Sequence, residues 1–504
     1  MNGVIRRNNA PAGYSVGHSF RRFLLAGVLI VLLTTAAAAT AAFEAVSSVA
    51  DLFAKGGLIS SPDLTPTGGG TPTTILILGS DRRAKGAIDQ NVPAHSDTIL
   101  LVHLDPGRGL TSEMSVPRDL YVQFSYHGSS YASKINFAYT LGGSTLSLTV
   151  VKHLLHIPIN YVVDLNFEAF DQVVDKIGCV YVDVDHLYYN SPAESALDNY
   201  AAINVRAGYQ QLCGQHALDY VRYRHDDNTF VRDAREQAFL RDAKEQLGVS
   251  GLLGHAGGII QALSKSISSN IRGSATIAGL LETVAGSVNG PVRQVRFPNN
   301  PLNVNGQDDQ TATAQEIRTV TQQFLEPTIV PPVVHAIPAA SAPRHHHRTA
   351  AGSAVATPSV PGLTATPSYA LSDALTLAVS VPFPVYVPML SLASGSPDPY
   401  NPFSSYTIRD PQGQLHHGYR IDWSTGSVGA YYGIEGMDWT DPPLFAHANT
   451  IERYGRQYLF VDNGTRVQDV GWIVGKDLYW VSNTVFGDLT TREMFAIAES
   501  AATP

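Results

Sequence analysis

Residues 97–119 read DTILLVHLDPGRGLTSEMSVPRD, with an apolar run on each side of the sequence DPGRG. Proline and glycine favour a tight turn, so this stretch predicts two consecutive β-strands joined at residues 105–109. Charged residues stand at the outer ends of both runs: Asp97 opens the first, and Arg118 with Asp119 closes the second. The stretch therefore predicts a sheet that carries charge where its strands end.

Strand and helix patterns alternate on both sides of this stretch. TTILILG, residues 73–79, is a continuous apolar run of the kind found in buried strands. Further patterns follow at residues 144–156 (helix), 160–185 (strand, helix, strand), 229–247 (helix), 291–298 (strand) and 313–325 (helix). This alternation predicts an α/β fold, an α/β/α sandwich with a central mixed sheet over residues 74–325.

The composition changes twice after this region. Residues 326–384 are rich in Pro, Ala, Ser and Thr, which predicts a disordered linker. Residues 385–504 contain alternating aromatic segments that predict antiparallel strands, and TTREMFAIAES predicts a last helix capped near Thr490 or Thr491. We expect a small C-terminal α+β domain with a mostly aromatic core. It shows no catalytic set of residues, and its role stays open.

The N-terminus carries an export signal. Four arginines within residues 1–22 precede Phe23–Phe43, which has no charged residue. About 20 apolar residues span a bilayer as a helix, and basic residues hold their flank in the cytoplasm. We expect a single-pass anchor in the cell membrane, a cytoplasmic segment 1–22, a flexible tether 44–73 and an extracytoplasmic body. The small residues of AAAATAA leave a cleaved signal peptide as the alternative.

Charge and cysteine content narrow the function further. The formal net charge of −9 argues against a nucleic-acid partner, which would demand a basic balance or stripe. The chain has two cysteines, Cys179 and Cys213, without CxxC spacing. In an exported domain such a pair predicts a disulfide rather than a zinc site.

Charged residues gather at the predicted strand ends and in YVRYRHDDNTFVRDAREQ, residues 220–237. The set is Asp81, Arg83, Asp97, Arg118, Asp119, Lys134, Arg222, Arg224, Arg232 and Arg235. Ligands of open α/β sheets collect where strand ends meet loops. Carboxylates beside arginines suit Mg²⁺ together with a diphosphate, because Mg²⁺ prefers oxygen ligands and guanidinium groups match phosphate oxygens.

The spacing within the arginine-rich stretch suggests how its side chains are arranged. Arg222 and Arg224 alternate, so on a strand they would share one face. Arg232, Arg235 and Glu236 lie three and four residues apart, so on a helix they would share one face. The alternative is a solvated helix on which Arg232 and Glu236 form an ordinary i,i+4 pair.

The motifs LGSDRR, HSDTILLVHLD, SVPRDLYV, SKINFAY and ALDYVRYRHDDNTFVRDAREQ occur in an order and spacing that resemble the LytR–CpsA–Psr family. The resemblance covers residues 74–247 well and extends toward residue 325. It implies an exported, membrane-anchored phosphotransferase that moves a glycopolymer from a polyprenyl diphosphate lipid to a peptidoglycan sugar hydroxyl. The bond formed would be a phosphodiester, Mg²⁺ or Mn²⁺ would assist, and an apolar pocket would hold the lipid.

The resemblance also implies roles for single residues. Asp81 and Asp97 would bind the metal. The diphosphate would be contacted by Arg83, Arg118, Lys134, Arg222, Arg224, Arg232 and Arg235. Catalysis would depend on Asp97, Arg118, Asp119, Arg222 and Arg224. Either Asp97 or Asp119 would accept the proton of the attacking hydroxyl, and the sequence does not choose between them.

Two positions depart from the family pattern, and they keep other functions open. Thr229 stands where the family usually has Asp, and Glu236 stands where it usually has Gln. A carboxylate at position 236 would tie up Arg232 or weaken diphosphate binding. The alternatives are a polyprenyl diphosphate pyrophosphatase and a non-catalytic exported scaffold that binds lipid diphosphate or glycan. Net acidity and the predicted export argue against a transcription attenuator.

Overall fold

A computed structural model describes residues 56–80, 94–193, 202–223, 231–243, 245–247, 267–287, 292–298, 300–304, 306–328, 332–337, 360–463 and 466–503. The predicted anchor Phe23–Phe43 and the segment before it lie outside these ranges. Within the described ranges, no helix has both the length and the apolar character needed to cross a membrane.

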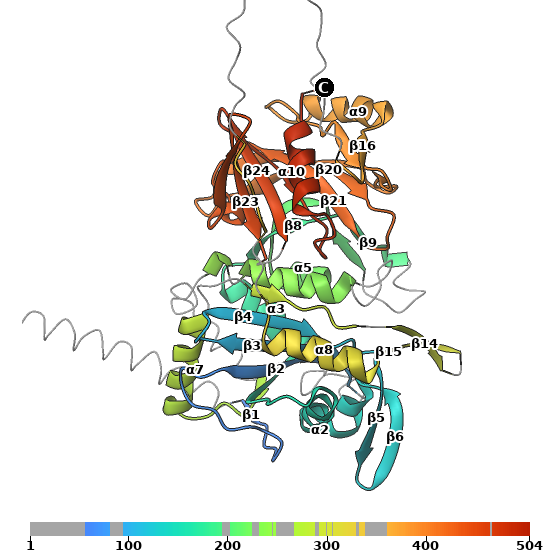
Figure 1. Cartoon of the computed structure of the whole chain (residues 1–504), viewed down its shortest axis with the longest axis vertical. Coiled ribbons are helices and arrows are strands. Elements are labelled where there is room, and N and C mark those ends of the chain that lie inside the picture. The colour runs from blue at the N-terminus through green and yellow to red at the C-terminus, as the bar shows by residue number, and fades with distance from the viewer. Residues whose placement is uncertain are drawn as a thin grey trace, which may run out of the picture.

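The first domain is built on a seven-stranded sheet (Figure 1). In spatial order its strands are β1 (Gly57–Leu58), β12 (Ile267–Ser269), β7 (Tyr161–Asn166), β2 (Thr73–Ser80), β3 (Ser96–Asp105), β4 (Leu110–Ser115) and β13 (Val292–Gln294). The expected hairpin is present, because β3 pairs antiparallel with β4 and closes at Asp105 and Leu110. β2 and β7 run parallel, as do β4 and β13, so the predicted mixed sheet is confirmed.

Helices cover both faces of this sheet, as the alternating pattern predicted. Successive strand residues point to opposite faces. Leu76 and Leu78 of β2 belong to the core beneath α2 (Phe137–Leu155) and α8 (Ala314–Leu325). Ile75 points the other way and packs in the cluster of α7 (Ser274–Ser287). The α/β/α class is therefore confirmed.

A second layer of structure lies between this sheet and the C-terminal domain (Figure 1). It contains α3 (Phe167–Lys176), α5 (Gly214–Arg222), a helix over residues 231–243, and a ribbon of β8 (Val180–Val184) with β11 (Gly208–Leu212). Three further hairpins are β5 (Tyr121–Tyr126) with β6 (Ser129–Lys134), β9 (Tyr188–Asn190) with β10 (Ile203–Val205), and β14 (Asn300–Val304) with β15 (Gln307–Thr311).

The flexible tether predicted over residues 44–73 is wrong for its described part, residues 56–73. Ile59 is buried, and the backbone N–H of Thr65 donates to the carbonyl of Ile159 at 2.8 Å. The Asp63 carboxylate accepts from Thr149 on α2. These contacts hold the segment on the domain surface, although its Pro, Thr and Gly content is typical of a linker.

The C-terminal domain contains an eight-stranded antiparallel sheet. Its strands are β18 (Ser396–Pro397), β19 (Phe403–Arg409), β20 (Leu415–Ser424), β21 (Tyr431–Met437), β22 (Asn449–Arg453), β23 (Arg456–Asp462), β24 (Val467–Val474) and β25 (Asp477–Ser482). The aromatic segments predicted as strands are confirmed. The last helix, α10 (Thr491–Ser500), begins with a capping box between Thr490 and Glu493.

The boundary of this domain differs from the prediction, because residues 360–384 belong to it. β16 (Leu363–Ala365) pairs with β17 (Leu390–Leu392), and α9 (Ser368–Ala374) leads into a 3₁₀-helix, η1 (Leu375–Val379). Leu377 and Phe383 are part of the core of the domain. The Pro- and Ser-rich composition concealed these widely spaced apolar residues. Residues 338–359 of the predicted linker lie outside the described ranges.

The two domains pack tightly against each other. Tyr181 and Tyr209 of the β8–β11 ribbon share an apolar cluster with Trp439, Phe445 and Trp480 of the C-terminal domain, where η2 (Pro443–Phe445) also lies. Aromatic rings that bury large areas at a domain interface make independent motion costly.

A buried ion network lies at the same interface. Arg420 of β20 has 0% side-chain exposure and forms ion pairs with Asp183 of β8 and with Asp422 and Glu435 of its own domain. Trp480 Nε1 also donates to Asp183 at 3.0 Å. One guanidinium thus joins the carboxylates of both domains.

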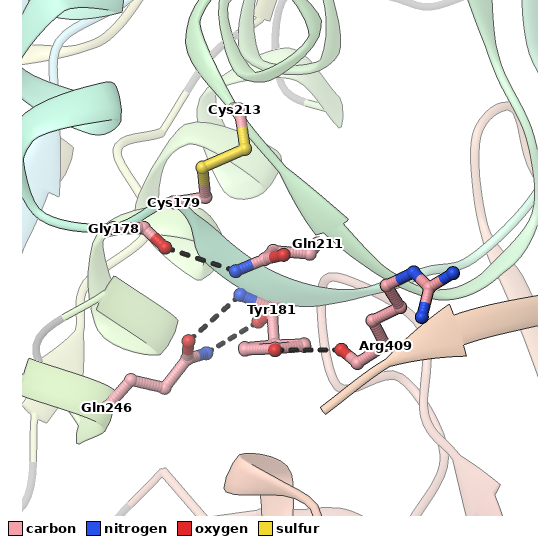
Figure 2. Close-up of a disulfide and its surroundings, with 7 residues drawn as sticks. All are labelled: Gly178, Cys179, Tyr181, Gln211, Cys213, Gln246 and Arg409. Carbon is pink, nitrogen blue, oxygen red and sulfur yellow. Dashed lines mark hydrogen bonds between the residues drawn. A yellow bond between two sulfur atoms is a disulfide. The ribbon is translucent and has the colours of Figure 1, made fainter. Parts of the chain in front are cut away.

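The predicted disulfide between Cys179 and Cys213 is confirmed. Figure 2 shows that it joins the turn before β8 to the residue that precedes α5. Gln246 accepts from the backbone N–H of Tyr181 at 2.9 Å, and the Tyr181 hydroxyl donates to the carbonyl of Arg409 at 2.9 Å (Figure 2). The disulfide and these bonds hold the ribbon between the two domains.

We predict that replacing both cysteines with serine lowers the free energy of unfolding by about 3–4 kcal/mol, because the bond closes a loop of 34 residues. Urea denaturation of the full chain measures this loss. The unreduced wild type, assayed with a thiol reagent after denaturation, should show no reactive thiol. Two reactive thiols would contradict the bond.

We also predict that Arg420→Met destabilises the chain by about 3–5 kcal/mol, because it leaves three carboxylates without their shared cation. Arg409→Met on the neighbouring strand β19 is the control, since the Arg409 side chain donates to the carbonyl of Gly413 at an exposed position. Denaturant unfolding compares the two variants. Equal stability of both would show that the network contributes nothing to docking.

Candidate active site

A cavity of about 860 Å³ opens where β2 and β3 meet the second layer. Its apolar lining consists of Ile77, Leu100, Phe137, Leu165, Phe170, Leu218, Val221, Phe239 and Leu240. Its charged or titratable lining consists of His95, Asp97, Arg118, Asp119, Lys134, Arg222, Arg232 and Glu236. The cavity can therefore hold a chain-like apolar ligand against its apolar wall and an anion against its cations.

Four residues predicted from the strand ends come together in a chain of ion pairs. Asp97 Oδ1 pairs with Arg118, and Arg118 Nε lies 3.6 Å from Asp119 Oδ2. Lys134 Nζ lies 3.0 Å from Asp119 Oδ1 and 3.5 Å from Asp309 Oδ1. The acids hold both cations in fixed positions at the cavity wall, which limits the entropy they would lose on binding an anion.

Arg222 also lines the cavity, although the local structure predicted for it is wrong. Residues 214–222 form helix α5, and Arg222 stands in its last turn. Ala217, Leu218 and Val221 recur at helical spacing and are buried, so packing selects the helix over the predicted strand. Arg222 Nε lies 3.7 Å from Asp219 Oδ1. Arg224, its predicted partner, lies outside the described residues, as do Asp81, Arg83 and Thr229.

Arg235 does not line this cavity. Its guanidinium carbon lies 4.4 Å from the ring centroid of Tyr188 and 5.6 Å from that of Tyr220, and its NH2 group donates to the carbonyl of Tyr223. It is fully buried. The expectation that Arg232 and Arg235 share one ligand-facing surface is therefore wrong. Arg235 instead holds the chain directly after Arg222.

Glu236 lines the cavity beside Arg232 and strand β3. Its Oε1 accepts from the Thr98 hydroxyl at 3.0 Å and lies 3.6 Å from Arg232 Nε. Arg232 makes its closer ion pair with Asp233, at 2.8 Å. Burial raises the pKa of Glu236 to about 8 against the opposing effect of Arg232. Burial therefore favours the neutral carboxyl, which can donate a hydrogen bond as the glutamine usual in the family can.

The described residues supply part of the predicted metal site. Asp97 lies at the cavity and presents carboxylate oxygens, which are ligands that Mg²⁺ accepts. Within the described ranges, the one group of three potential ligands is Asp175 with Cys179 and Cys213, whose sulfurs are already bonded to each other. The predicted pair of Asp97 with Asp81 therefore stays a prediction.

The sequence matches known proteins over the domain that holds this cavity. Residues 53–325 match the model of the LytR_cpsA_psr family. The chain belongs to this family. The match covers more than half of the chain and agrees with the motifs that surround the cavity, and it does not extend over the C-terminal domain.

Curated relatives of this LytR_cpsA_psr family member match part of the chain. The polyisoprenyl-teichoic acid–peptidoglycan teichoic acid transferase TagU of Bacillus cereus is 30% identical over 202 residues, which are 40% of this chain and 60% of TagU. The corresponding transferase TagV of Bacillus subtilis is 29% identical over 204 residues, which are 40% of this chain and 50% of TagV. The chain thus spans no more than about 60% of the length of either relative.

A solved structure of the family protein YwtF (TagT) with bound octaprenyl pyrophosphate lipid is also similar. It is 24% identical, covers 51% of this chain and 90% of its own, and has a TM-score of 0.37.

Sequence reasoning missed Thr98 and Gly79 at the cavity wall, and it missed Asp164 on the opposite face of the sheet. Thr98 bonds Glu236, and it fits because Gly79 opposite has no side chain; a Cβ there would stand 2.9 Å from the Cβ of Thr98. Asp164 is buried in β7 and accepts from the hydroxyls of Tyr139 at 2.8 Å and Ser144 at 2.6 Å. A lone acid within the apolar run YVVDLN was the available signal for Asp164.

We predict a pH-dependent stability from Glu236. A raised pKa in the folded state means that its stabilising contribution is complete below about pH 4.5 and is lost as the pH rises through about 8. The free energy of unfolding should therefore fall by a few kcal/mol more between pH 5 and pH 8.5 in the wild type than in Glu236→Gln. Glu452→Gln, at an exposed position of β22, is the control. Parallel pH profiles for wild type and Glu236→Gln, measured by denaturant unfolding, would refute the assignment.

Proposed function

We propose that this protein transfers a glycopolymer from a polyprenyl diphosphate carrier to a sugar hydroxyl of peptidoglycan and forms a phosphodiester. The observation that carries the proposal is the amphipathic cavity, in which apolar walls meet four cations from separate elements: Arg118, Lys134, Arg222 and Arg232. Family membership and the transferase activity named for TagU and TagV support it. The proposed binding of the lipid and the proposed chemical step are argued from the same residues.

The donor lipid would occupy the apolar part of the cavity. A volume of about 860 Å³ lies within the range of small-molecule sites, and aromatic and aliphatic walls exclude water from a prenyl chain. The diphosphate would lie against the four cations, whose donors match phosphate oxygens. Protonated Glu236 would add a neutral donor beside Arg232 without adding negative charge.

The reaction would break one bond of the diphosphate and form one new ester bond. The acceptor hydroxyl oxygen attacks the phosphorus that carries the glycopolymer, and the bond to the lipid-side phosphate breaks. Polyprenyl phosphate leaves, and its growing charge is stabilised by the arginines. Mg²⁺ or Mn²⁺ held by Asp81 and Asp97 would add further charge compensation. This leaves Asp119 as the proposed acceptor of the hydroxyl proton, held in place by Lys134 and Arg118.

We also propose that the protein acts outside the cytoplasm, anchored by residues 23–43. The Cys179–Cys213 disulfide supports export, because such bonds persist in oxidising compartments. Peptidoglycan, the proposed acceptor, lies on that side of the membrane.

We predict that Arg222→Ala lowers glycopolymer transfer about 100-fold or more, because it removes a cation that faces the leaving group. Its ion pair with Asp219 is long and part-exposed, so the free energy of unfolding should change by less than about 1 kcal/mol. The assay uses purified full chain in detergent, labelled lipid-linked glycan, Mg²⁺ and peptidoglycan. Arg318→Gln, on the exposed side of α8, is the control and should transfer normally.

The same assay separates the rival functions. Label that appears as free glycan in place of peptidoglycan-bound glycan would indicate a pyrophosphatase. Tight binding of polyprenyl diphosphate without any turnover would indicate a scaffold. Chelation by EDTA should abolish transfer, and full activity in EDTA would remove the metal from the proposal. Near-normal transfer by Arg222→Ala would remove Arg222 from the site.

A further inference from the structure

A second cavity, of about 290 Å³, lies between the two domains. The first domain contributes Arg293 of β13, the following Arg296, and residues of the 231–243 helix. The C-terminal domain contributes Arg466 and Phe486. Neither domain forms this cavity alone, and none of these residues belongs to the proposed donor site.

The wall of this cavity is basic although the whole chain is acidic. Three arginines face two acids, Asp233 and Asp488. Asp233 is already paired with Arg232 at 2.8 Å, and Asp488 accepts from the Thr484 hydroxyl at 3.0 Å. Burial lowers the pKa of Arg293, so a bound anion would stabilise its charged form. The cavity is therefore suited to an anionic group.

An aromatic ring lies among these cations. The guanidinium carbon of Arg296 stands 4.6 Å from the ring centroid of Phe486, which is close enough for a cation–π contact that holds both groups in place. The apolar ring can pack against the face of a sugar, and the neighbouring guanidinium groups can bind a negative charge on it.

The two cavities share one wall. Arg232 and Glu236 of the 231–243 helix line the cavity of about 860 Å³, the proposed donor cavity. Asp233 and Gln237 of the same turns line the second cavity, of about 290 Å³, the inter-domain cavity. A helix with its side chains is about 10 Å across, so the two spaces lie roughly that far apart. A glycan held in the inter-domain cavity could present a neighbouring sugar to the donor cavity.

We propose that the inter-domain cavity is a subsite that binds a peptide carboxylate of the acceptor peptidoglycan, through Arg296 and Arg466. This rests on the proposed function, in which the lipid diphosphate fills the other cavity and the acceptor has to approach separately. Peptidoglycan carries carboxylates on its peptides, and guanidinium groups bind carboxylates in bidentate fashion. The C-terminal domain thereby gains a role, because it supplies Arg466 and Phe486.

The test measures binding of a soluble disaccharide-peptide fragment of peptidoglycan to the full chain in detergent, by calorimetry at low salt. Wild type should bind the fragment with free carboxylates about tenfold or more tightly than the same fragment with amidated carboxylates. Arg296→Gln/Arg466→Gln should lose this preference. Both arginines are exposed, so folding should be unaffected, and an unchanged melting temperature confirms it. Arg318→Gln should retain the preference.

Equal affinity of wild type for the two fragments would overturn the proposal. The proposal would also be overturned if Arg318→Gln lost the preference for free carboxylates as fully as the double variant. Tighter binding of inorganic phosphate or of a phosphate-linked oligosaccharide, lost in the double variant, would assign the cavity to the donor polymer instead. If the double variant has a lower melting temperature than wild type, the single variants Arg296→Gln and Arg466→Gln are compared with wild type for the two fragments in its place. In the transfer assay, the double variant should raise KM for peptidoglycan and leave kcat unchanged.

Binding of the fragment does not require turnover, so the two proposals can fail separately. Carboxylate-dependent binding through these arginines, without any transfer, would refute the proposed function and leave the subsite standing. Normal transfer with unchanged acceptor KM in the double variant would refute the subsite alone.

Discussion

The position of strand β3 between β2 and β4 is the constraint on which the donor cavity depends. β3 pairs antiparallel with both neighbours. Its Ser96 lies opposite Ser80 of β2, and its Leu100 lies opposite Ser115 of β4. A slip of one residue would turn every side chain of the strand to the other face. Thr98 would then leave Glu236, and Leu100 would leave the apolar wall. The hydrophobic face that packs beneath α2 fixes this register, so core packing also positions the site.

The half-buried charges at the cavity form a chain of ion pairs rather than one isolated pair. Asp97, Arg118, Asp119, Lys134 and Asp309 alternate in sign at the donor cavity. Each cation is oriented by an acid before any ligand arrives, and an uncompensated buried charge would be far more costly. Burial also raises the pKa of Glu236, which reduces the negative charge next to Arg232, whose closer partner is Asp233.

The 231–243 helix and the strand β8 connect the two domains mechanically. The helix lines both cavities, and Gln246, a little beyond it, bonds the backbone of Tyr181 in β8. Asp183, two residues along the same strand, pairs with Arg420 of the C-terminal domain. Strand β8 thus contacts both the C-terminal domain and the segment that follows the helix carrying Arg232.

Local sequence patterns predicted the fold class, the β3–β4 hairpin, the aromatic strands of the C-terminal domain, the disulfide and the gathering of Asp97, Arg118, Asp119 and Lys134. These features depend on local periodicity, turn residues and strand ends, which a single sequence displays. Long-range packing, in contrast, places Arg222 on a helix and Arg235 against tyrosines, and it folds residues 56–73 and 360–384 onto their domains. It also forms the inter-domain cavity and the pairing of Arg420 with Asp183. Such features depend on which distant residues exclude water together, and burial of this kind leaves no local pattern in the sequence.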